Sequence, residues 1–557
     1  MTQNTSFNLV DEPWVRIRDE NGIMREVSLL ELFNQAPHIK CLANDLPTQD
    51  FAILRLALAI LQRSIVPTVD EDDDPSEVWG ELWNAGELPM PQIESYLAVW
   101  HKRFDLFDGD EPFMQIADLH TPKNDYSDVK KIIADVPDGE ALFSLRSGIG
   151  VESLSYAEAA RWLVHAQAFD PAGIKSGTVG DPRVKNGKSY PIGTGWAGGI
   201  GGLYFEGHTL FETMLLNFIA CDADEDVLFP FDDVPSWERP VEKFGEDDRY
   251  PTGRLDLFTW QSRRIRLVPR DGRVVGVVLT NGDKIDSRNL NHLEPMTAWR
   301  RSLAQEKKQK SSLPIYMPRI HQPDRALWRG LDSVFGSDGE EEAPSVIPPG
   351  IETWLSYLAS SDGGNRIGRE YLLMVHAVGF EYGTQNSVIV NVIDDKVELK
   401  AFLLSRKGRP LVTLAKQCAE ETSRGVTVLG NLAGNLCKAA GGSGADEING
   451  AISASTKQAY FEIDAAFRSW LATLDDTSDL VAARERWRRW ARSIIAAVAR
   501  DLLRDLGPDA IVGAPVRGTK NKGVGWMTAS RAEGIFQSSL RKALPLEDDQ
   551  ETKKEVR

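Results

Sequence analysis

Hydrophobic positions along the first 390 residues follow patterns typical of both helices and strands. Residues 51–65 are apolar on nearly every side, which predicts a buried helix, and residues 154–169 predict another. Alternating apolar and polar residues between 14 and 29 predict two short strands joined by a turn. Residues 254–287 predict several β-strands separated by tight turns. We therefore expect a mixed α/β domain over residues 1–390.

The pattern changes after about residue 395, where long amphipathic stretches predict helices alone. The predicted helices are 397–405, 410–421, 428–439, 455–474, 479–506 and 527–544. Short polar segments join them, which is typical of an α-helical bundle. The predicted fold class is therefore α+β, with the mixed domain followed by a four-helix-type bundle over residues 391–557.

Residues 170–207 contain eleven glycines and three prolines, a composition that predicts loops and tight turns. Loop 169–177 offers small residues, backbone N–H groups, and Lys175 beside the hydroxyl of Ser176, a combination suited to phosphate. A purely structural glycine-rich turn explains the same residues. Residues 381–387 predict an exposed tip between two apolar runs, where Gln385 could offer its flat amide to a base pair. An ordinary turn has the same pattern.

The net charge of −18 argues against a protein that binds nucleic acid by bulk electrostatics. The charge is regional, however, because residues 1–140 carry 11 Lys and Arg against 27 Asp and Glu, whereas the rest of the chain is close to neutral. Basic residues also recur at multiples of four in the predicted helix 479–506, which places them on one face. This stripe fits either a solvated surface or a phosphate track. Its members are Arg484, Arg488, Arg492, Arg500 and Arg504.

The four cysteines lie far apart without a CxxC motif, which predicts neither a zinc site nor a disulfide framework and fits a reducing compartment. No stretch approaches about 18 consecutive apolar residues, and the first residues lack the pattern of a secretory signal. We therefore expect a cytoplasmic protein without membrane contact.

Gly193 to Gly198 matches the GxGxxG pattern of dinucleotide sites, but the strand before it is short and the glycines after it would interrupt a helix. The sequence shows no P-loop, HExxH or GxSxG motif. We therefore predict no catalytic residue, no cofactor and no metal ligand. Two alternatives stay open: an enzyme whose site lies within residues 170–207, and a scaffold that contacts only protein.

Several blocks together resemble the CasA family, the large subunits of the type I-E CRISPR Cascade complex. They occur in the family's order along nearly the whole chain, and the likeness is loosest between residues 220 and 360. The blocks are Phe7–Val15, Pro112–Gln115, Gln167–Gly177, the glycine-rich stretch before residues 209–219, and the tip Tyr382–Ser387 before the helical C-terminus.

The resemblance implies a non-catalytic protein that recognises the protospacer-adjacent motif in double-stranded DNA. The family reads that motif mainly from the minor groove, with a glycine loop, a lysine on a β-hairpin and a glutamine wedge. The glycine loop corresponds here to Phe169, Asp170, Pro171, Ala172 and Gly173, the lysine to Lys284, and the wedge to Gln385 with Asn386. FDPAG contains less glycine than the family's loop, so the preferred motif does not follow from the resemblance.

The resemblance also implies partners. A loop at residues 138–146, with Phe143 as its inserted aromatic, would meet the 5′ handle of the guide RNA and a neighbouring Cascade subunit. Family members also recruit the effector helicase-nuclease, and their helical bundle lies near the displaced DNA strand. Arg484, Arg488, Arg492 and Arg500 would form part of that track.

Overall fold

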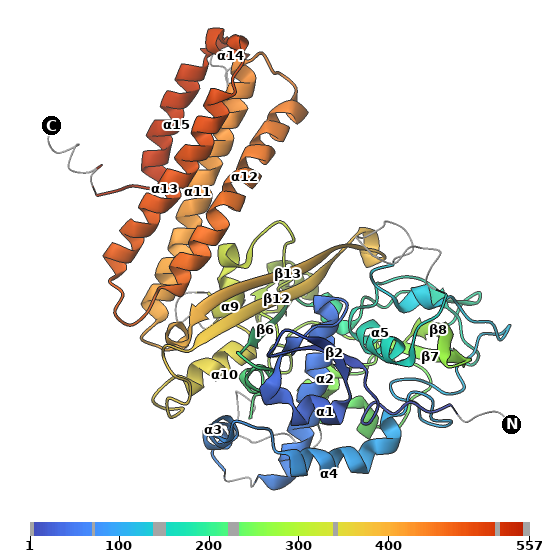
Figure 1. Cartoon of the computed structure of the whole chain (residues 1–557). Helices are drawn as coiled ribbons and strands as arrows, with labels where there is room; N and C mark the ends of the chain where they lie inside the picture. Colours follow the sequence, from blue (N-terminus) through green and yellow to red (C-terminus); the bar gives the residue numbers. More distant parts are fainter. Residues whose placement is uncertain are drawn as a thin grey trace. The chain divides into compact units, whose positions relative to one another are not determined.

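The computed structural model describes residues 5–69, 73–136, 152–220, 233–337, 343–517, 524–547 and 549, and the chain divides into two compact units (Figure 1). Unit 1 consists of Met1–Arg325, Asp332–Gly368 and Leu372–Lys396. Unit 2 consists of Ala326–Leu331, Arg369–Tyr371 and Val397–Arg557.

Unit 1 combines small sheets with helices, as the α+β prediction requires. One sheet has the order β2-β1-β3, with β1 Val15–Asp19, β2 Met24–Val27 and β3 Ile39–Leu42. A second has the order β13-β12-β6, with β6 Gly202–Glu206, β12 Leu372–Tyr382 and β13 Ile389–Lys400. The remaining strands are β4 Lys175–Ser176 with β5 Lys188–Ser189, β7 Arg263–Arg270 with β8 Arg273–Asn281, and β9 Trp299–Arg301 between β10 Tyr316–Pro318 and β11 Val346–Ile347.

The predicted helix at residues 51–65 is the centre of unit 1. It forms the larger part of α2, Pro47–Ile65, which is buried on nearly all sides and packs against other helices and against β12. The other helices of this unit are α1 Leu29–Asn34, α3 Pro75–Ala85, α4 Met90–Trp100, α5 Tyr156–Phe169, α6 Leu210–Leu216, α7 Arg254–Phe258, α8 Leu303–Gln309, α9 Asp332–Phe335 and α10 Gly350–Leu358. The predicted helix at 154–169 and the two strands between 14 and 29 are confirmed.

A buried ion pair ties α2 to the loop that precedes β9. Arg55 donates two hydrogen bonds to the Glu294 carboxylate, at 2.8 and 2.7 Å, and both side chains are almost fully buried. The indole of Trp196 donates to the same carboxylate at 2.6 Å. Each buried charge of the pair therefore has a partner. Because Trp196 donates to the same carboxylate, the glycine-rich segment around it is attached to the core.

The prediction of strands over residues 254–287 is right for its middle and wrong at both ends. β7 and β8 form the expected hairpin, but residues 254–258 form helix α7 and the described residues 282–287 form no strand. The alternation around Asp256 suggests a strand with one solvated face. Asp256 is instead buried and paired with Arg239 and Arg249. The alternation of apolar and polar residues here therefore does not identify a solvent-exposed face.

Unit 2 contains the long helices of the predicted bundle: α11 Arg409–Ala439, α12 Ala445–Ala472, α13 Leu480–Arg504 and α15 Ala529–Ala543. Helix α11 packs against the other three, and the short α14 Pro508–Val512 precedes the hairpin of β14 Ala514–Arg517 and β15 Val524–Met527 (Figure 1). That hairpin corrects the expectation of helices alone after residue 395.

Two further predictions for this unit were wrong. Residues 397–405 continue β13 and end in a 3₁₀ turn, because Val397 and Leu399 are buried at the two-residue spacing of a strand. Helices 410–421 and 428–439 are one helix. Gly425 lies inside this helix without interrupting it. An added Cβ at this position would lie 2.9 Å from Ile495, so the glycine allows close helix packing.

No helix among the described residues is both long enough and apolar enough to span a bilayer.

Candidate nucleic-acid interface

Helix α5 leads directly into the predicted motif-reading loop. The helix begins after Ser155, whose hydroxyl accepts the backbone N–H of Glu158, and ends at Phe169. The Phe169 ring is fully buried against Phe51 and Phe380. The structure therefore corrects the predicted loop at its first residue, because Phe169 anchors the loop from inside and does not present its ring to DNA.

Asp170, the second residue of that loop, is also buried. One oxygen of its carboxylate, Oδ2, pairs with Lys175 at 2.6 Å and with Arg263 at 2.5 Å. Burial alone would raise the pKa of Asp170, but the charges of Lys175 and Arg263 outweigh it and hold that pKa below its usual range. Lys175 is thus engaged within the protein, which corrects the expectation of a cation presented directly to phosphate.

Arg263 fixes the backbone around this ion pair. It is fully buried at the start of β7 and donates to the carbonyl oxygens of Asp170, Pro171 and Gly193, at 3.0, 3.1 and 2.9 Å. A single guanidinium thereby joins the start of the loop to the later turn at Gly193. Pro171 and Gly173 are half-buried, and a Cβ added to Gly173 would meet no atom within 4 Å. The side chain of Ala172 between them is buried, which corrects the expectation that it contacts DNA.

The predicted wedge lies beside this loop. Gln385 and Asn386 are exposed in the short turn Thr384–Asn386 that joins β12 to β13, the long hairpin in Figure 1. Both residues have positive φ, at 57° and 54°. The backbone N–H of Ala172 donates to the carbonyl of Asn386 at 2.8 Å. The structure thus brings together the two segments that the sequence singled out separately.

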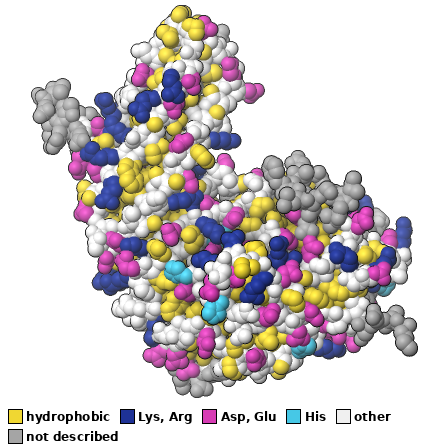
Figure 2. All heavy atoms as spheres, in the orientation of Figure 1, with side chains coloured by type: hydrophobic (Ala, Val, Ile, Leu, Met, Phe, Trp, Pro, Cys, Tyr) yellow, Lys and Arg dark blue, Asp and Glu magenta, His cyan; other side chains and the backbone are white. Residues whose placement is uncertain are grey.

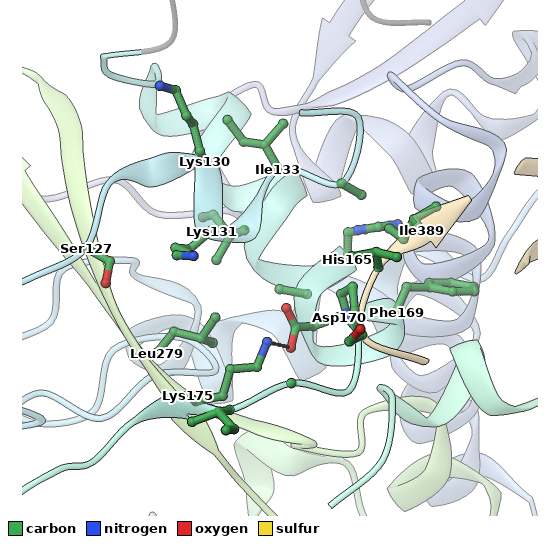
Figure 3. A pocket seen from close by; sticks show the side chains of 18 of the residues that line it. Ser127, Lys130, Lys131, Ile133, His165, Phe169, Asp170, Lys175, Leu279 and Ile389 are labelled. Atoms are coloured by element: carbon green, nitrogen blue, oxygen red, sulfur yellow. Dashed lines mark ion pairs between the residues drawn. The ribbon is translucent and has the colours of Figure 1, made fainter. Parts of the chain in front are cut away.

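A cavity of about 210 Å³ opens next to the junction of loop and tip (Figure 3). The loop forms one wall with Asp170 and Lys175, and the start of β13 forms another with Ile389. The short 3₁₀ helix Val129–Ile132 and Leu279 of β8 complete it. The His165 imidazole borders the cavity, and burial lowers its pKa to about 3, so this ring is uncharged at neutral pH.

The glycines after the loop serve packing. An added Cβ at Gly195 would lie 2.4 Å from the backbone of Ala168, and one at Gly198 would lie 2.2 Å from the hydroxyl of Tyr382. A short 3₁₀ turn, Trp196–Gly199, overlaps the end of the GxGxxG match, where a dinucleotide site requires the start of an α-helix. The geometry therefore gives no support to a dinucleotide site within residues 170–207.

Two predicted site residues are not placed by the structure beside the loop and the Gln385 tip. Lys284 is exposed three residues after β8 ends, at the opposite end of the β7–β8 hairpin from its turn, so the structure does not place it on a hairpin tip. Its backbone N–H donates to Glu246 at 2.8 Å. Phe143 and its loop 138–146 lie outside the described residues.

The arginine stripe of α13 divides into members with different roles. Arg484 and Arg488 both bond the buried carboxylate of Glu421 on α11, at 2.5 and 2.6 Å, and Arg492 pairs with Asp549 at 2.5 Å. Arg484 and Arg488 thus join α13 to α11, and Arg492 joins α13 to the segment after α15, so these three side chains make contacts within the protein and do not form a continuous exposed track. Arg500 is exposed, and the structure shows no ion pair between it and another described residue.

Sequence reasoning missed Arg263 as the residue that shapes the loop and Lys131 at the rim of the cavity. Arg263 stood out only as one of several basic residues on a predicted strand, and its partners lie 93 and 70 positions away. Among the described residues, no group of three or more His, Cys, Asp or Glu side chains is arranged to hold a metal ion.

Comparison with known proteins places this architecture in a family. Residues 8–499 match the model of the CRISPR-associated protein Cse1 family. A curated relative from Thermus thermophilus, described as CRISPR-associated protein CasA/Cse1, is 28% identical over 351 residues, which cover 61% of this chain and 62% of that protein.

Solved structures agree over almost the full length. The crystal structure of Thermobifida fusca Cse1 is 41% identical, with a TM-score of 0.85 and coverage of 97% of this chain and 98% of that one. Cse1 from Acidimicrobium ferrooxidans is 28% identical, with a TM-score of 0.81 and coverage of 97% and 99%. A chain of a CRISPR RNA-guided surveillance complex shares the fold at 17% identity, with a TM-score of 0.68 and coverage of 97% and 99%. This chain belongs to the CRISPR-associated protein Cse1 family.

Proposed function

We propose that this protein is the non-catalytic subunit of an RNA-guided CRISPR complex that recognises the protospacer-adjacent motif in double-stranded DNA and begins to open the duplex there. One observation carries the proposal: the loop at Pro171–Gly173 and the exposed Gln385 tip are held side by side by the hydrogen bond between Ala172 and Asn386. A reader and a wedge must act on neighbouring base pairs, and these two segments are positioned to do so.

The loop is suited to the minor groove. That groove is about 6 Å wide, so it admits backbone and small side chains, and its pattern of donors and acceptors is degenerate. Pro171 and Gly173 present little side-chain volume at the surface. Arg263 holds the carbonyls of Asp170 and Pro171, and the Asn386 carbonyl holds the N–H of Ala172, so the loop backbone is fixed at several points. A preformed loop loses little conformational entropy on binding, which favours recognition of a few related motifs with few contacts.

Gln385 is suited to the wedge. It extends from a turn between two long strands, so force on its side chain is carried by the sheet β13-β12-β6. Separating one base step costs a few kcal/mol, which new contacts to the protein must offset. Once the first pair is open, pairing with the guide RNA reads the remaining sequence, so the protein needs to recognise only a short motif.

The proposal includes partners. The solved surveillance complex that contains the same fold is RNA-guided, and we propose equivalent contacts here with other Cascade subunits, with the 5′ handle of the guide through Phe143, and with the effector helicase-nuclease. Arg500 remains the proposed contact to the displaced strand. The three described cysteines are free thiols, which fits action in the reducing cytoplasm.

The test uses the assembled complex that contains the full chain. A duplex library randomised over the base pairs beside the guide-matched segment first identifies the preferred motif. Gln385→Ala should then weaken binding of the motif duplex about tenfold, which is about 1.4 kcal/mol, without changing assembly of the complex. Gly173→Val should also weaken it, because the added side chain has room in the fold but projects from the loop.

Asn391→Ala is the matched control, because Asn391 is also polar and exposed and lies on the same hairpin. Its affinity for the motif duplex should equal that of the wild type. If Gln385→Ala and Gly173→Val both leave DNA affinity and motif preference unchanged, the protein is a scaffold and the motif-reading proposal is wrong.

A further inference from the structure

The cavity beside the wedge has the size and lining of a site for one nucleotide. At about 210 Å³ it is smaller than the roughly 300–1,000 Å³ typical of drug-sized ligands, which suits a single flat ring system. Ile133, Leu279 and Ile389 supply apolar walls from three different parts of the chain (Figure 3). Such walls favour the faces of a base, whose edges then need polar partners.

Polar partners are present inside. Both ion pairs of Asp170 use its Oδ2 atom, whereas Oδ1 makes no hydrogen bond to another described residue and points into the cavity in Figure 3. The Lys175 ammonium has three N–H donors, of which its bond to Asp170 uses one. An acceptor beside a donor matches a base edge that carries an exocyclic amino group next to a ring acceptor, as in cytosine and adenine.

The charge around the cavity favours an anion. Lys131 lies at the rim on the side of Ser127, whereas Lys130 points away (Figure 3). The positive charge of Lys131 reaches Lys175, since both it and Arg263 help to lower the pKa of Lys175, after burial as the main cause. Of the described residues that line the cavity, Lys130, Lys131 and Lys175 are cationic and Asp170 is the one carboxylate, so the lining itself is basic in a chain whose total charge is −18.

From these observations we propose that the cavity receives one unpaired nucleotide whose base carries an exocyclic amino group, with the base between the apolar walls and its phosphate near Lys131. This inference rests on the proposed function, because the wedge at Gln385 supplies the unpaired nucleotide next to the motif. The cavity keeps that nucleotide from re-forming its pair, so it stabilises the first opened step.

The experiment compares duplexes that carry the preferred motif and differ at the first position beyond it. In either strand in turn, that position holds cytosine, thymine or an abasic site. For one strand, we expect the wild-type complex to bind the abasic duplex about tenfold more weakly than the cytosine duplex, with thymine in between. Equal affinities for cytosine and abasic duplexes in both strands would overturn the proposal without any variant.

Ser127→Phe fills the cavity. The Ser127 backbone exchanges two hydrogen bonds with Val277, both at 2.9 Å, so its side-chain direction is fixed. This variant should lose the difference between cytosine and abasic duplexes while keeping the preference for the motif over a scrambled sequence. Retention of the full cytosine preference in a filled cavity would contradict the proposal.

Lys131→Ala provides a second variant that does not change the interior. It should weaken binding of the cytosine duplex severalfold, whereas Lys123→Ala, which removes another exposed lysine, should not. Failure of the proposed function itself is distinguishable, because it appears as an unchanged motif preference in Gln385→Ala. If free dCMP bound the full chain more tightly than the unpaired nucleotide in DNA does, the site would belong to a free nucleotide and our assignment to DNA would be wrong.

Discussion

His165 is an uncharged base in the interior, next to the loop that we propose reads DNA. Its ring stacks on Phe169, packs edge-on against Phe380 and lies 3.0 Å from the hydroxyl of Thr48. Burial is the main reason that its pKa falls to about 3. The end of α5 therefore depends on one imidazole staying neutral.

That dependence predicts an effect of acid on stability. The unfolded chain binds a proton at His165 below about pH 6.5, whereas the folded protein does not until about pH 3, so stability falls as the pH is lowered between these values. His165→Phe removes this contribution, and the wild type should lose up to about 1.4 kcal/mol per pH unit relative to the variant. Urea denaturation between pH 4 and 7.5 measures the difference. Parallel pH profiles for the two proteins would show that the prediction is wrong, and His38→Phe, at an exposed position, serves as the control.

At the scale of single residues, the sequence predicted which polar side chains matter better than it predicted which side chains they bind within the fold. It identified Lys175 and Gln385 as polar groups on loops. Gln385 does lie in the turn Thr384–Asn386, whereas Lys175 begins the two-residue strand β4. It could not predict that Asp170 holds Lys175, because nothing in the local pattern distinguishes a buried carboxylate from an exposed one. Arg263 reaches Gly193 across 70 positions, a relation that only the fold creates.

At the scale of elements, helices and strands with long, uniform patterns were predicted well. Elements that are short, or whose pattern fits both a helix and a strand, were predicted poorly. Helix α2 followed from its apolar run, and the tip between β12 and β13 followed from polar residues between two apolar stretches. The sequence predicted two helices, 410–421 and 428–439, where the structure has the single helix α11, in which Gly425 permits close packing. The stripe on α13 has the correct helical spacing, but spacing does not show that Glu421 on another helix neutralises two of its arginines.

Glu421 should therefore control the stability of the bundle. Burial alone would raise the pKa of Glu421, but the guanidinium groups of Arg488 and Arg484 outweigh it and lower that pKa. Glu421→Gln removes the charge that both arginines face and should lower the free energy of unfolding by about 2–3 kcal/mol. Thermal or urea denaturation checks this value. Glu420→Gln, one residue away and exposed, should have almost no effect, and an equal loss in both variants would contradict our interpretation.

At the scale of the whole molecule, an acidic protein can recognise DNA if few residues do the reading. The excess of acidic residues lies within the first 140 positions, and Figure 2 shows Lys and Arg side chains interspersed with Asp and Glu over the visible face. Weak nonspecific attraction favours rapid release of wrong sites, so a negative total charge is compatible with a subunit that must search for a short motif.

This view predicts a modest salt dependence to which single exposed cations contribute. If Arg500 contacts one phosphate of the displaced strand, Arg500→Ala should reduce the slope of log affinity against log salt by about 1 for the assembled complex. Arg504→Ala removes an arginine that is already paired with Asp501 and should leave the slope unchanged. An unchanged slope in Arg500→Ala would show that Arg500 contacts no phosphate and is an ordinary solvent-exposed residue.

The central claim is that the Gln385 tip enters the duplex at the edge of the motif, and site-specific crosslinking tests it most directly. A photo-reactive amino acid in place of Gln385, in the assembled complex bound to a motif-containing duplex, should crosslink to the base pairs at the junction between motif and guide-matched segment. The same amino acid in place of Asn391 should give much less crosslinked DNA. Crosslinks from position 385 only to protein, or to DNA far from the motif, would contradict the account.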